Sequence, residues 1–468
     1  MEVSVGACIT ITNPSKEIVE YCKENLVIDN PEYAKKVRMH FWVGNTPKTM
    51  RLYQRNGDQL IIPYGLLREL LHEIQFADKV TKEFQPAEHI DYGKPLPLYD
   101  YQQYAVRMLQ ASQYGILQSK AGSGKTQMGI ALTKLYGVKT LWITHTVDLL
   151  NQSKSRAEKY IDHSLIGTIT GGKVDIGKGI TFATVQTLNK LDLSQFKNTW
   201  DLIIVDECHR VAGTPTALTM FYKVLNQLCA RHKFGLSATV HRADGMIKAT
   251  YAVLGGISYI VPDEAVADKT MKVGVCPVST GVQISYECLN TDGTINYAKL
   301  ITYITEHEER NQLIIDKIVE NQEHPALILS DRLLHLTTLR DMLPLDMLIN
   351  SAMVSGKMNT KKGKEEREAI LEKMRNGQLK YLFATYSLAK EGLDVPCLER
   401  LYLTTPQKDY AVITQSIGRI ARISEGKNPP IVYDFIDDMG YLVKAFKSRK
   451  SIYLKNGCYF TDGNNLHQ

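Results

Sequence analysis

Length, composition and charge exclude several classes of protein at the outset. The 468 residues suffice for about three domains, and 44% hydrophobic with 23% charged residues is typical of a soluble globular chain. No apolar run is long enough to cross a bilayer, no signal segment follows Met1, and the eight cysteines form no C-x-x-C pair. We therefore expect no membrane partner and no zinc site, while the net charge of +6 indicates a polyanionic partner only weakly.

The first 92 residues predict a small α/β domain. Apolar residues alternate over positions 3–11, as in one face of a strand, and Asn56-Gly57 between two strand-like runs predicts a type I′ hairpin turn. The leucines of positions 66–74 form the apolar stripe of a helix. Pro95 and Pro97 then predict a linker, so we expect few contacts across this boundary.

A phosphate-binding loop is predicted next. Its sequence is Ser119-Lys120-Ala121-Gly122-Ser123-Gly124-Lys125-Thr126. Gly122 and Gly124 allow the backbone to turn tightly, so that successive N–H groups can point at an anion. Lys125 can reach the β- and γ-phosphates, and the hydroxyl of Thr126 can bind Mg²⁺. A predicted buried strand at 114–118 precedes the loop and a predicted helix follows it, which is the context that such a loop requires.

Two adjacent acidic residues further along the chain complement this phosphate-binding loop. The apolar run 202–205 predicts a buried parallel strand that delivers Asp206 and Glu207 to its carboxyl end. Asp206 can hold Mg²⁺ through water, and Glu207 can accept the proton of the attacking water. Capping of the following helix is the alternative role of the pair, which the upstream loop disfavours. Loop and pair together predict a site of nucleoside triphosphate hydrolysis, and Cys208 inside it indicates reduced thiols and a cytoplasmic location.

The order of the motifs resembles superfamily 2 helicases over residues 98 to 440. Asp206-Glu207-Cys208-His209 is similar to box II of that family. The other similar segments are the Tyr101-Gln102 element, motif Ia at 141–152, motif Ic at 181–188, motif III at 235–239, motif IV at 326–331, motif V at 384–396 and motif VI at 415–422. The branch that they resemble contains the phage UvsW-like, XPB-like and restriction-type (ResIII) enzymes.

The resemblance implies an α/β fold with two tandem RecA-like lobes, each a doubly wound parallel sheet, behind the small accessory domain. The expected boundaries are residues 1–92 for the N-terminal accessory domain, 93–262 for the first, ATP-binding lobe, 263–299 for an interlobe connection and 300–468 for the second lobe.

The resemblance also implies ATP and Mg²⁺ as cofactors. Gln102 would read the adenine, while Thr126 and Asp206 would hold the metal ion. The residues implied in ATP binding or catalysis are Gln102, Ser119, Lys120, Ala121, Gly122, Ser123, Gly124, Lys125, Thr126, Asp206, Glu207, Gly392, Asp394, Gln415, Arg419 and Arg422. Nucleic-acid contact or coupling is implied for Thr146, Thr184, Gln186, Ser237, Thr239, Ser330 and Thr385.

Motif VI and motif V would supply the second lobe's share of catalysis. By the resemblance, Arg419 and Arg422 act as arginine fingers on the γ-phosphate, Gln415 contacts the γ-phosphate or its water, and Asp394 contacts the ribose. A salt bridge is the alternative role of Arg419. Since these residues belong to the second lobe, we expect hydrolysis to be coupled to lobe motion.

The N-terminal domain carries a weaker resemblance, over residues 38–66, to that of phage UvsW-type helicases, which act on branched DNA. Its basic residues are Lys35, Lys36, Arg38, Lys48, Arg51 and Arg55, with Phe41, Trp42, Tyr53 and Tyr64 between them. We expect DNA contact, with one or two of these aromatic rings facing nucleic acid. The alternative is a domain that only packs against the first lobe.

These features predict an ATP-dependent DNA helicase or translocase that remodels branched or duplex DNA, with single strands a possible substrate. Gln415 opens motif VI where many RNA-directed relatives have His, and only twenty positions separate Pro396 from Ser416, too few for a strand-separating hairpin. The alternatives are the motor subunit of a restriction-type system, an RNA-directed helicase, and a nucleic-acid clamp with an inert ATP site. We expect action in the cytosol of a bacterial or phage-infected host.

Overall fold

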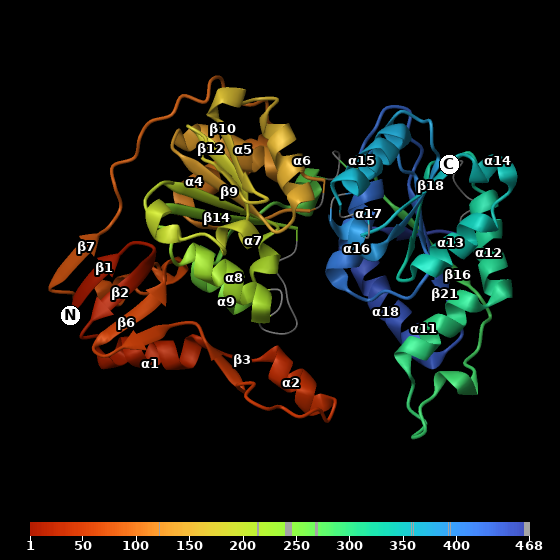
Figure 1. Cartoon of the computed structure of the whole chain (residues 1–468), viewed down its shortest axis with the longest axis horizontal. Helices are drawn as coiled ribbons and strands as arrows, with labels where there is room; N and C mark the ends of the chain where they lie inside the picture. The colour runs from red at the N-terminus through yellow and green to blue at the C-terminus, as the bar shows by residue number, and fades with distance from the viewer. Residues whose placement is uncertain are drawn as a thin grey trace. The chain divides into compact units, whose positions relative to one another are not determined.

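The computed structural model describes residues 1–120, 122–212, 215–238, 246–266, 270–356, 358, 360–391, 393 and 395–462. The chain divides into two compact units, whose main parts are Met1–Lys120 with Gly124–Ala265, and Val266–Gln468 (Figure 1). In the part of the chain that the structure describes, no helix combines the length and the apolar character needed to cross a membrane.

The N-terminal domain is a five-stranded sheet with the order β5-β6-β2-β1-β7. Its strands are β1 (Glu2–Val5), β2 (Cys8–Thr12), β5 (Gln54–Asn56), β6 (Gln59–Pro63) and β7 (Lys79–Lys82), and its helices are α1 (Lys16–Asn25) and the short α3 (Leu71–Ile74). The predicted hairpin is present, with Gly57 and Asp58 as its loop, one position later than expected. The helix expected over 66–74 is wrong for its first half: Leu66 ends a 3₁₀ turn (Tyr64–Leu66), residues 67–70 form turns, and the helix covers only Leu71–Ile74.

A separate ribbon projects from this domain. It consists of β3 (Val27–Asp29), α2 (Pro31–Arg38) and β4 (Thr49–Arg51), and β3 pairs with β4 alone. We call residues 27–51 the arm. Figure 1 shows the arm extending away from the five-stranded sheet, beyond the end of α1.

The N-terminal domain and the first lobe share a hydrophobic core. Tyr64 and Leu66 pack in one buried cluster with Tyr114, Ala249 and Ala252 of the lobe. The backbone at Gly65 comes so close that a Cβ there would lie 2.3 Å from the amide nitrogen of Gly255. The expectation of few contacts across the Pro95–Pro97 boundary is therefore wrong: the 3₁₀ turn is pressed against α9, and removal of residues 1–92 would uncover core residues of the lobe.

Lys233 is a fully buried cation at this junction. Its Nζ donates hydrogen bonds to the carbonyl oxygens of Ala7 (3.1 Å) and Leu225 (2.9 Å) and lies 5.1 Å from the centroid of the Tyr64 ring. Burial lowers the pKa of Lys233 to about 8, and the neighbouring Cys8 opposes this shift. One side chain thus ties the β1–β2 turn of the accessory domain to the strand that leads into motif III.

The first lobe is built on an eight-stranded sheet with the order β11-β10-β12-β9-β13-β14-β8-β15, parallel except for edge strand β11. The strands are β8 (Gly115–Gln118), β9 (Thr140–Thr144), β10 (Ile166–Thr170), β11 (Lys173–Asp175), β12 (Ile180–Thr184), β13 (Leu202–Asp206), β14 (His232–Ser237) and β15 (Ile257–Ile260). The helices are α4 (Asp100–Ser112), α5 (Lys125–Tyr136), α6 (Val147–Ala157), α7 (Val185–Leu188), α8 (Pro215–Leu225) and α9 (Ile247–Leu254).

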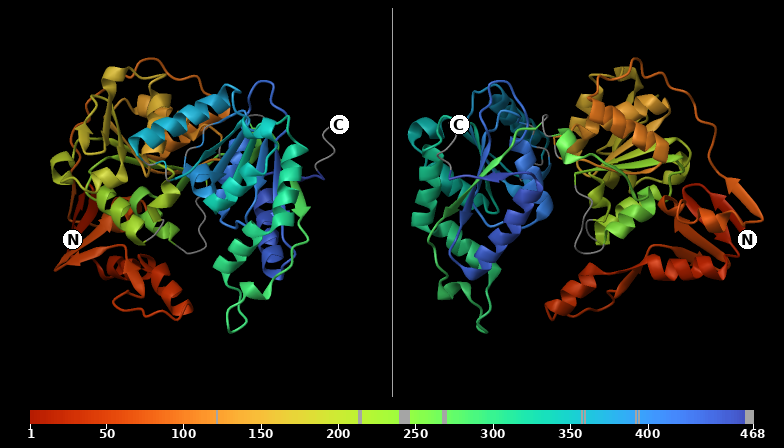
Figure 2. Two further views of the ribbon diagram at one scale, coloured as in Figure 1. Left: turned by 45° about the vertical axis from the view of Figure 1, so that its right-hand side comes forward. Right: turned by 180° about the vertical axis from the view of Figure 1, so that it is seen from behind.

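Successive residues of a strand point to opposite faces of the sheet, and here the buried residues on both faces are mainly apolar. Helices therefore cover both faces. Ile143 packs in one cluster with residues of α7, α8 and α9. On the other face Trp142 meets α5, where a Cβ at Gly129 would lie 2.6 Å from the indole ring. The predicted doubly wound lobe is confirmed, and Figure 2 shows its two helical layers from further directions.

The second lobe repeats this plan with an all-parallel sheet in the order β18-β19-β17-β20-β21-β16-β22. Its strands are β16 (Gly274–Ser279), β17 (Ala326–Ser330), β18 (Ser351–Val354), β19 (Tyr381–Thr385), β20 (Arg400–Leu403), β21 (Ile431–Ile436) and β22 (Tyr459–Phe460). Its helices are α11 (Tyr297–Glu306), α12 (Glu308–Val319), α13 (Leu333–Asp341), α14 (Leu345–Leu348), α15 (Lys361–Arg375), α16 (Tyr386–Glu391), α17 (Tyr410–Ile420) and α18 (Gly440–Lys455). Since β16 pairs with β21, this sheet takes in part of the expected connection 263–299.

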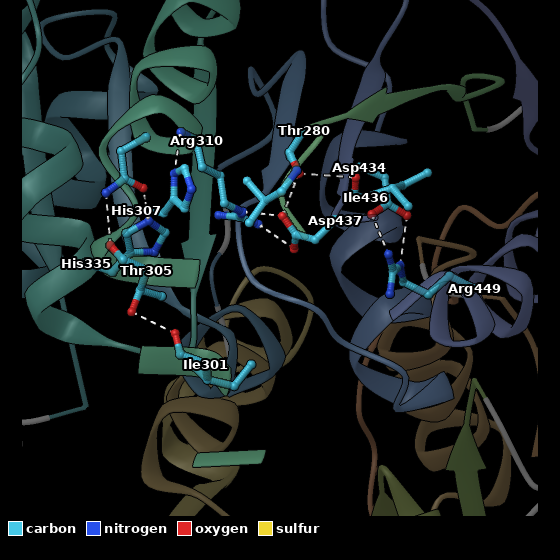
Figure 3. A network of polar contacts seen from close by, with 12 residues as sticks. Thr280, Ile301, Thr305, His307, Arg310, His335, Asp434, Ile436, Asp437 and Arg449 are labelled. Carbon is cyan, nitrogen blue, oxygen red and sulfur yellow. Dashed lines mark hydrogen bonds and ion pairs between the residues drawn. The ribbon is translucent and has the colours of Figure 1, made fainter. Parts of the chain in front are cut away.

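Two buried ion pairs fix strand β21 to the helices around it (Figure 3). Nε of Arg310, on α12, lies 2.6 Å from Oδ1 of Asp437, which also accepts a hydrogen bond from Oγ1 of Thr280 (2.7 Å). Arg449, on α18, binds both carboxylate oxygens of Asp434 at 2.8 and 2.9 Å. Each buried charge therefore has an opposite charge, and Asp437, Asp434 and Arg449 make further hydrogen bonds, while Nη1 of Arg310 has no partner among the described residues.

The buried lysine yields a prediction about pH. The pKa of Lys233 is lower in the folded protein than in the unfolded chain, so the folded state binds fewer protons between about pH 8 and the ordinary lysine pKa. The free energy of unfolding should therefore rise across that interval, by on the order of 3 kcal/mol. Urea unfolding at pH 8 and pH 10 measures this rise, which Lys233→Met should reduce by the contribution of Lys233; Lys427, whose pKa is also lowered to about 8, contributes to the remainder. An equal rise in both proteins would contradict the assignment.

Candidate ATP site and nucleic-acid interface

The phosphate-binding loop follows β8 and runs into the first turn of α5. Gly122 and Gly124 have φ values of 85° and 81°, a region that favours glycine, so the tight turn depends on both. Nζ of Lys125 donates to the carbonyl oxygens of Ser119 (3.1 Å) and Lys120 (3.2 Å). The lysine therefore lies inside the curve of the loop, where phosphate oxygens can replace those carbonyls as its acceptors. Ala121 lies outside the described residues.

Gln102 stands against this loop. It is buried, its Oε1 accepts a hydrogen bond from the backbone N–H of Tyr99 (3.1 Å), and its Nε2 donates to the hydroxyl of Tyr101 (3.3 Å). A Cβ at Gly124 would lie 2.4 Å from that Nε2. The structure thus brings Gln102 to the loop, although its amide caps α4 here, and adenine reading stays a prediction.

Asp206 and Glu207 lie at the carboxyl end of β13, beside the loop. Oδ2 of Asp206 accepts a hydrogen bond from Oγ of Ser153 (3.1 Å) and Oδ1 from the N–H of Glu207 (3.0 Å). Burial, and then the charge of Glu207, raises the pKa of Asp206, while Lys125 opposes the shift. A buried carboxylate of this kind is stabilised by a cation.

The donor set of this corner fits Mg²⁺. The ion prefers oxygen ligands and keeps several waters, and the buried carboxylate of Asp206 supplies an oxygen that a divalent cation would neutralise. The Thr126 hydroxyl, in the first turn of α5, supplies another oxygen next to Lys125. Thr126 and Asp206 are therefore the residues that would hold the ion.

His209 joins the acidic pair to motif III. Its Nδ1 lies 3.3 Å from Oε2 of Glu207 and 3.0 Å from Oγ of Ser237. The carbonyl oxygen of Ser237 in turn accepts a hydrogen bond from the N–H of Ser119, where the phosphate loop begins (3.0 Å). Thr239 lies outside the described residues.

Glu207 has an unusual backbone conformation. Its φ of 50° lies in the left-handed region, which costs a non-glycine residue about 1–3 kcal/mol and persists only where the surroundings impose it. Here the N–H of Glu207 is bound to Asp206 and its carboxylate lies beside His209. The neighbours of Glu207 therefore fix the direction of its carboxylate.

Motifs Ia and Ic meet at the ends of adjacent strands β9 and β12. Nε2 of Gln186 donates to the carbonyl oxygen of His145 (2.7 Å), which links the two turns. Oγ1 of Thr146 caps α6 by accepting from the N–H of Leu149 (3.3 Å), and Oγ1 of Thr184 lies 2.8 Å from that of Thr187. The structure thus gathers Thr146, Thr184 and Gln186, and their nucleic-acid contacts stay predictions.

Motif VI forms most of α17 in the second lobe. Gln415 is buried, and its Oε1 has no hydrogen-bond partner among the residues that the structure describes. Arg419, one helical turn on, donates from Nε to the carbonyl oxygen of Ala389 (3.2 Å), and Arg422 follows the end of the helix. The spacing of four residues sets Gln415 and Arg419 on one side of α17, while Arg422, beyond the helix, forms an isolated antiparallel bridge with Thr270.

The predicted positions of motifs IV and V in this lobe differ in burial and in hydrogen-bond partners. Ser330 is fully buried, with its Oγ 3.0 Å from Nδ1 of His335 and bonded to the N–H of Arg332 (3.2 Å). Its hydroxyl thus orders the motif IV turn from inside. Oγ1 of Thr385 lies 3.0 Å from Oγ of Ser387. Gly392 and Asp394 lie outside the described residues.

Lys427 is a residue of this region that the motifs did not indicate. Its Nζ donates to the carbonyl oxygens of Pro396 (2.8 Å), Ile420 (2.7 Å) and Arg422 (2.8 Å). It joins the end of motif V to the end of motif VI, and burial lowers its pKa to about 8. The sequence contains no signal for this role, because the acceptors are backbone groups brought together by the fold.

Comparison with known proteins agrees with this geometry. A family profile described as "Type III restriction enzyme, res subunit" matches residues 95–242, and one described as "Helicase conserved C-terminal domain" matches residues 309–424. The chain belongs to the superfamily 2 helicases of the restriction-enzyme and XPB type. It is accordingly an ATP-hydrolysing helicase.

Individual relatives differ in the nucleic acid that their names give. "Putative ATP-dependent RNA helicase L396" of Acanthamoeba polyphaga mimivirus is 27% identical over 416 residues, 86% of this chain and 76% of the relative. "DNA 3'-5' translocase XPB2" of Sulfurisphaera tokodaii is 26% identical over 388 residues, 75% of this chain and 85% of the relative.

Among solved structures, the "ATP-dependent Type ISP restriction-modification enzyme LlaBIII bound to DNA" has a TM-score of 0.57 at 16% identity. The match covers 84% of this chain but only 32% of that enzyme, so this helicase corresponds to about a third of it. At this identity the likeness shows the fold alone.

Replacing Glu207 tests the hydrolysis site. Glu207→Gln keeps the shape of the side chain but cannot accept the proton of water, so kcat for ATP should fall about 10²–10⁴-fold while ATP binding persists. Steady-state hydrolysis and binding of a fluorescent ATP analogue measure the two effects. Weak binding together with persistent hydrolysis would contradict the role.

Replacing Lys427 tests the tie between motifs V and VI. Lys427→Met leaves three carbonyl groups without their charged donor, which should lower stability by about 1.5–3 kcal/mol. Because the end of motif VI, with Arg422, loses its tie, the substitution should also lower kcat more than it raises KM for ATP. Arg422→Ala should change both quantities in the same directions. Lys447→Met, at an exposed lysine of α18, is the matched control. An unchanged kcat in Lys427→Met would refute the tie.

Proposed function

We propose that this helicase is a DNA-dependent ATPase that translocates on, and remodels, branched or duplex DNA. The observation that carries the proposal is the common core that joins the ATP-binding lobe to an accessory domain with a basic segment at residues 35–51. Whatever the accessory domain binds must move together with that lobe. Residues 35–51 of that domain contain five lysines and arginines and no acidic residue, which favours a nucleic-acid backbone as the ligand of this segment.

The second lobe supports remodelling over simple strand separation. β20 ends at Leu403 and α17 begins at Tyr410, so six residues connect them. Residues 395–420 are all described, and they contain no β-hairpin. A motor without such a wedge at this point is suited to tracking along duplex DNA and moving a branch point.

The proposed hydrolysis reaction uses residues of both lobes. Lys125 binds the β- and γ-phosphates, and Glu207 takes the proton of the attacking water. Mg²⁺ bound by Thr126 and Asp206 would neutralise phosphate charge. Arg419 and Arg422 stabilise the charge of the transferring phosphoryl group, and Gln415, with its unpartnered Oε1, contacts the γ-phosphate or its water.

The contact from Glu207 through His209 to Ser237 offers a route that couples ATP hydrolysis to nucleic-acid binding. A change in charge at Glu207 during hydrolysis alters the hydrogen bond of His209 to Ser237. Ser237 is also bonded to the start of the phosphate loop. We propose that motif III carries the state of the nucleotide toward the nucleic-acid contacts of motifs Ia and Ic, which lie at the same edge of the sheet.

An RNA substrate is the second candidate, since a relative is named an RNA helicase. ATP hydrolysis measured with single-stranded DNA, duplex DNA, a four-way junction and RNA distinguishes the two. We expect the junction and duplex to stimulate kcat most and RNA least, with no stimulation in the Glu207→Gln variant. Stimulation by RNA equal to that by DNA would refute the DNA assignment.

A further inference from the structure

The arm holds its tip in a fixed conformation. Asn30, which is buried, caps α2 by accepting from the N–H of Glu32 (3.0 Å), and its Nδ2 donates to the carbonyl oxygen of Pro47 (2.9 Å). Nζ of Lys36 donates to Oγ1 of Thr46 (2.7 Å). These two bonds tie the end of the tip loop to α2, and the N–H of Phe41, which donates to the carbonyl oxygen of Lys36 (2.8 Å), ties its beginning. A passive linker would not need such ties.

An aromatic pair stands at this tip. Trp42 is 87% exposed and Phe41 is 59% exposed, although burying such a ring is normally favourable. Gly44 has a φ of 50°, and a Cβ there would lie 2.8 Å from the ring of Trp42. The ring therefore rests on the glycine backbone, which supports it while leaving most of its surface free.

Positive charge surrounds the aromatic pair. Residues 35–51 contain five lysines and arginines and no acidic residue. These basic residues are Lys35, Lys36, Arg38, Lys48 and Arg51. A ligand that complements this tip must offer both negative charge and a flat apolar face, and a nucleic acid with an exposed base offers both.

We propose that Trp42 stacks on an unpaired or terminal base, with the lysines and arginines of the arm binding the phosphates beside it. The choice of nucleic acid rests on the proposed function. A base inside continuous duplex has both faces covered by its neighbours, so the arm would bind where pairing is interrupted, at a fork or a junction. Of the four aromatic residues that the sequence places among the basic ones, Tyr64 is buried in the shared core and Tyr53 packs against it, so Phe41 and Trp42 remain for this role.

Fluorescence provides a direct test, because Trp42 is the exposed one of three tryptophans, while Trp142 and Trp200 are buried. The full chain is titrated with a forked DNA that carries unpaired arms, with a covalently closed circular duplex, which has neither ends nor unpaired bases and should not quench, and with heparin. Stacking should quench emission with the fork, whereas heparin supplies charge without bases and should not. Trp42→Phe should lose the quenching but keep most of the affinity for the fork.

Affinity for the fork tests the energetic role of the ring. Trp42→Ala should weaken binding by about 5- to 100-fold, as expected for the loss of one stacked base. Phe76→Ala is the matched control, because Phe76 is a 68% exposed ring of the same domain outside the arm, and it should bind normally.

Three results would overturn the proposal: equal quenching by heparin and fork, fork-dependent quenching that persists in Trp42→Phe, or unchanged affinity of Trp42→Ala. DNA-stimulated ATP hydrolysis by the same proteins separates this failure from failure of the proposed function. Stimulation without quenching rejects the arm contact alone, whereas no stimulation by any DNA rejects both.

Discussion

The carboxyl edge of the parallel sheet in the first lobe is the constraint on which the rest depends. Parallel pairing of β13, β14 and β8 sets the ends of these strands side by side. Strand pairing alone therefore brings together Asp206, Ser237 and the start of the phosphate loop. The hydrogen bond from Ser119 to Ser237 and the contact through His209 then connect groups that sequence motifs treat separately.

The same sheet also carries the accessory domain. β14 runs from Lys233, whose ammonium group binds the turn of the N-terminal sheet, to Ser237 at the ATP site. Retaining a charged lysine in a fully buried position costs free energy unless its hydrogen bonds are satisfied, and both carbonyl partners lie within 3.1 Å. One strand therefore spans the distance between the domain that is proposed to hold DNA and the site that hydrolyses ATP.

In the second lobe, buried cations bind carboxylates at the end of strand β21 and backbone carbonyl groups near motif VI. Arg310 and Arg449 fix the end of β21 through Asp437 and Asp434, and Lys427 fixes three carbonyl groups around motif VI. A backbone hydrogen bond from the N–H of Met271 to the carbonyl oxygen of Ala421 (2.7 Å) also holds this end of motif VI. These bonds hold the segment that carries Arg419 and Arg422, the arginines that we propose for phosphate chemistry.

The sequence by itself determined the class of fold and the ATP site, because a phosphate loop and an acidic strand end need particular residue types at short spacing. Gly122, Gly124, Lys125 and Asp206 are recognisable for that reason. The docking of the accessory domain through Gly65 and Lys233, the break in the helix expected over 66–74, the pairing of β16 and the role of Lys427 were decided only by the tertiary structure. Each depends on backbone groups distant in sequence, and a carbonyl oxygen that accepts a hydrogen bond leaves no trace in the identity of its residue.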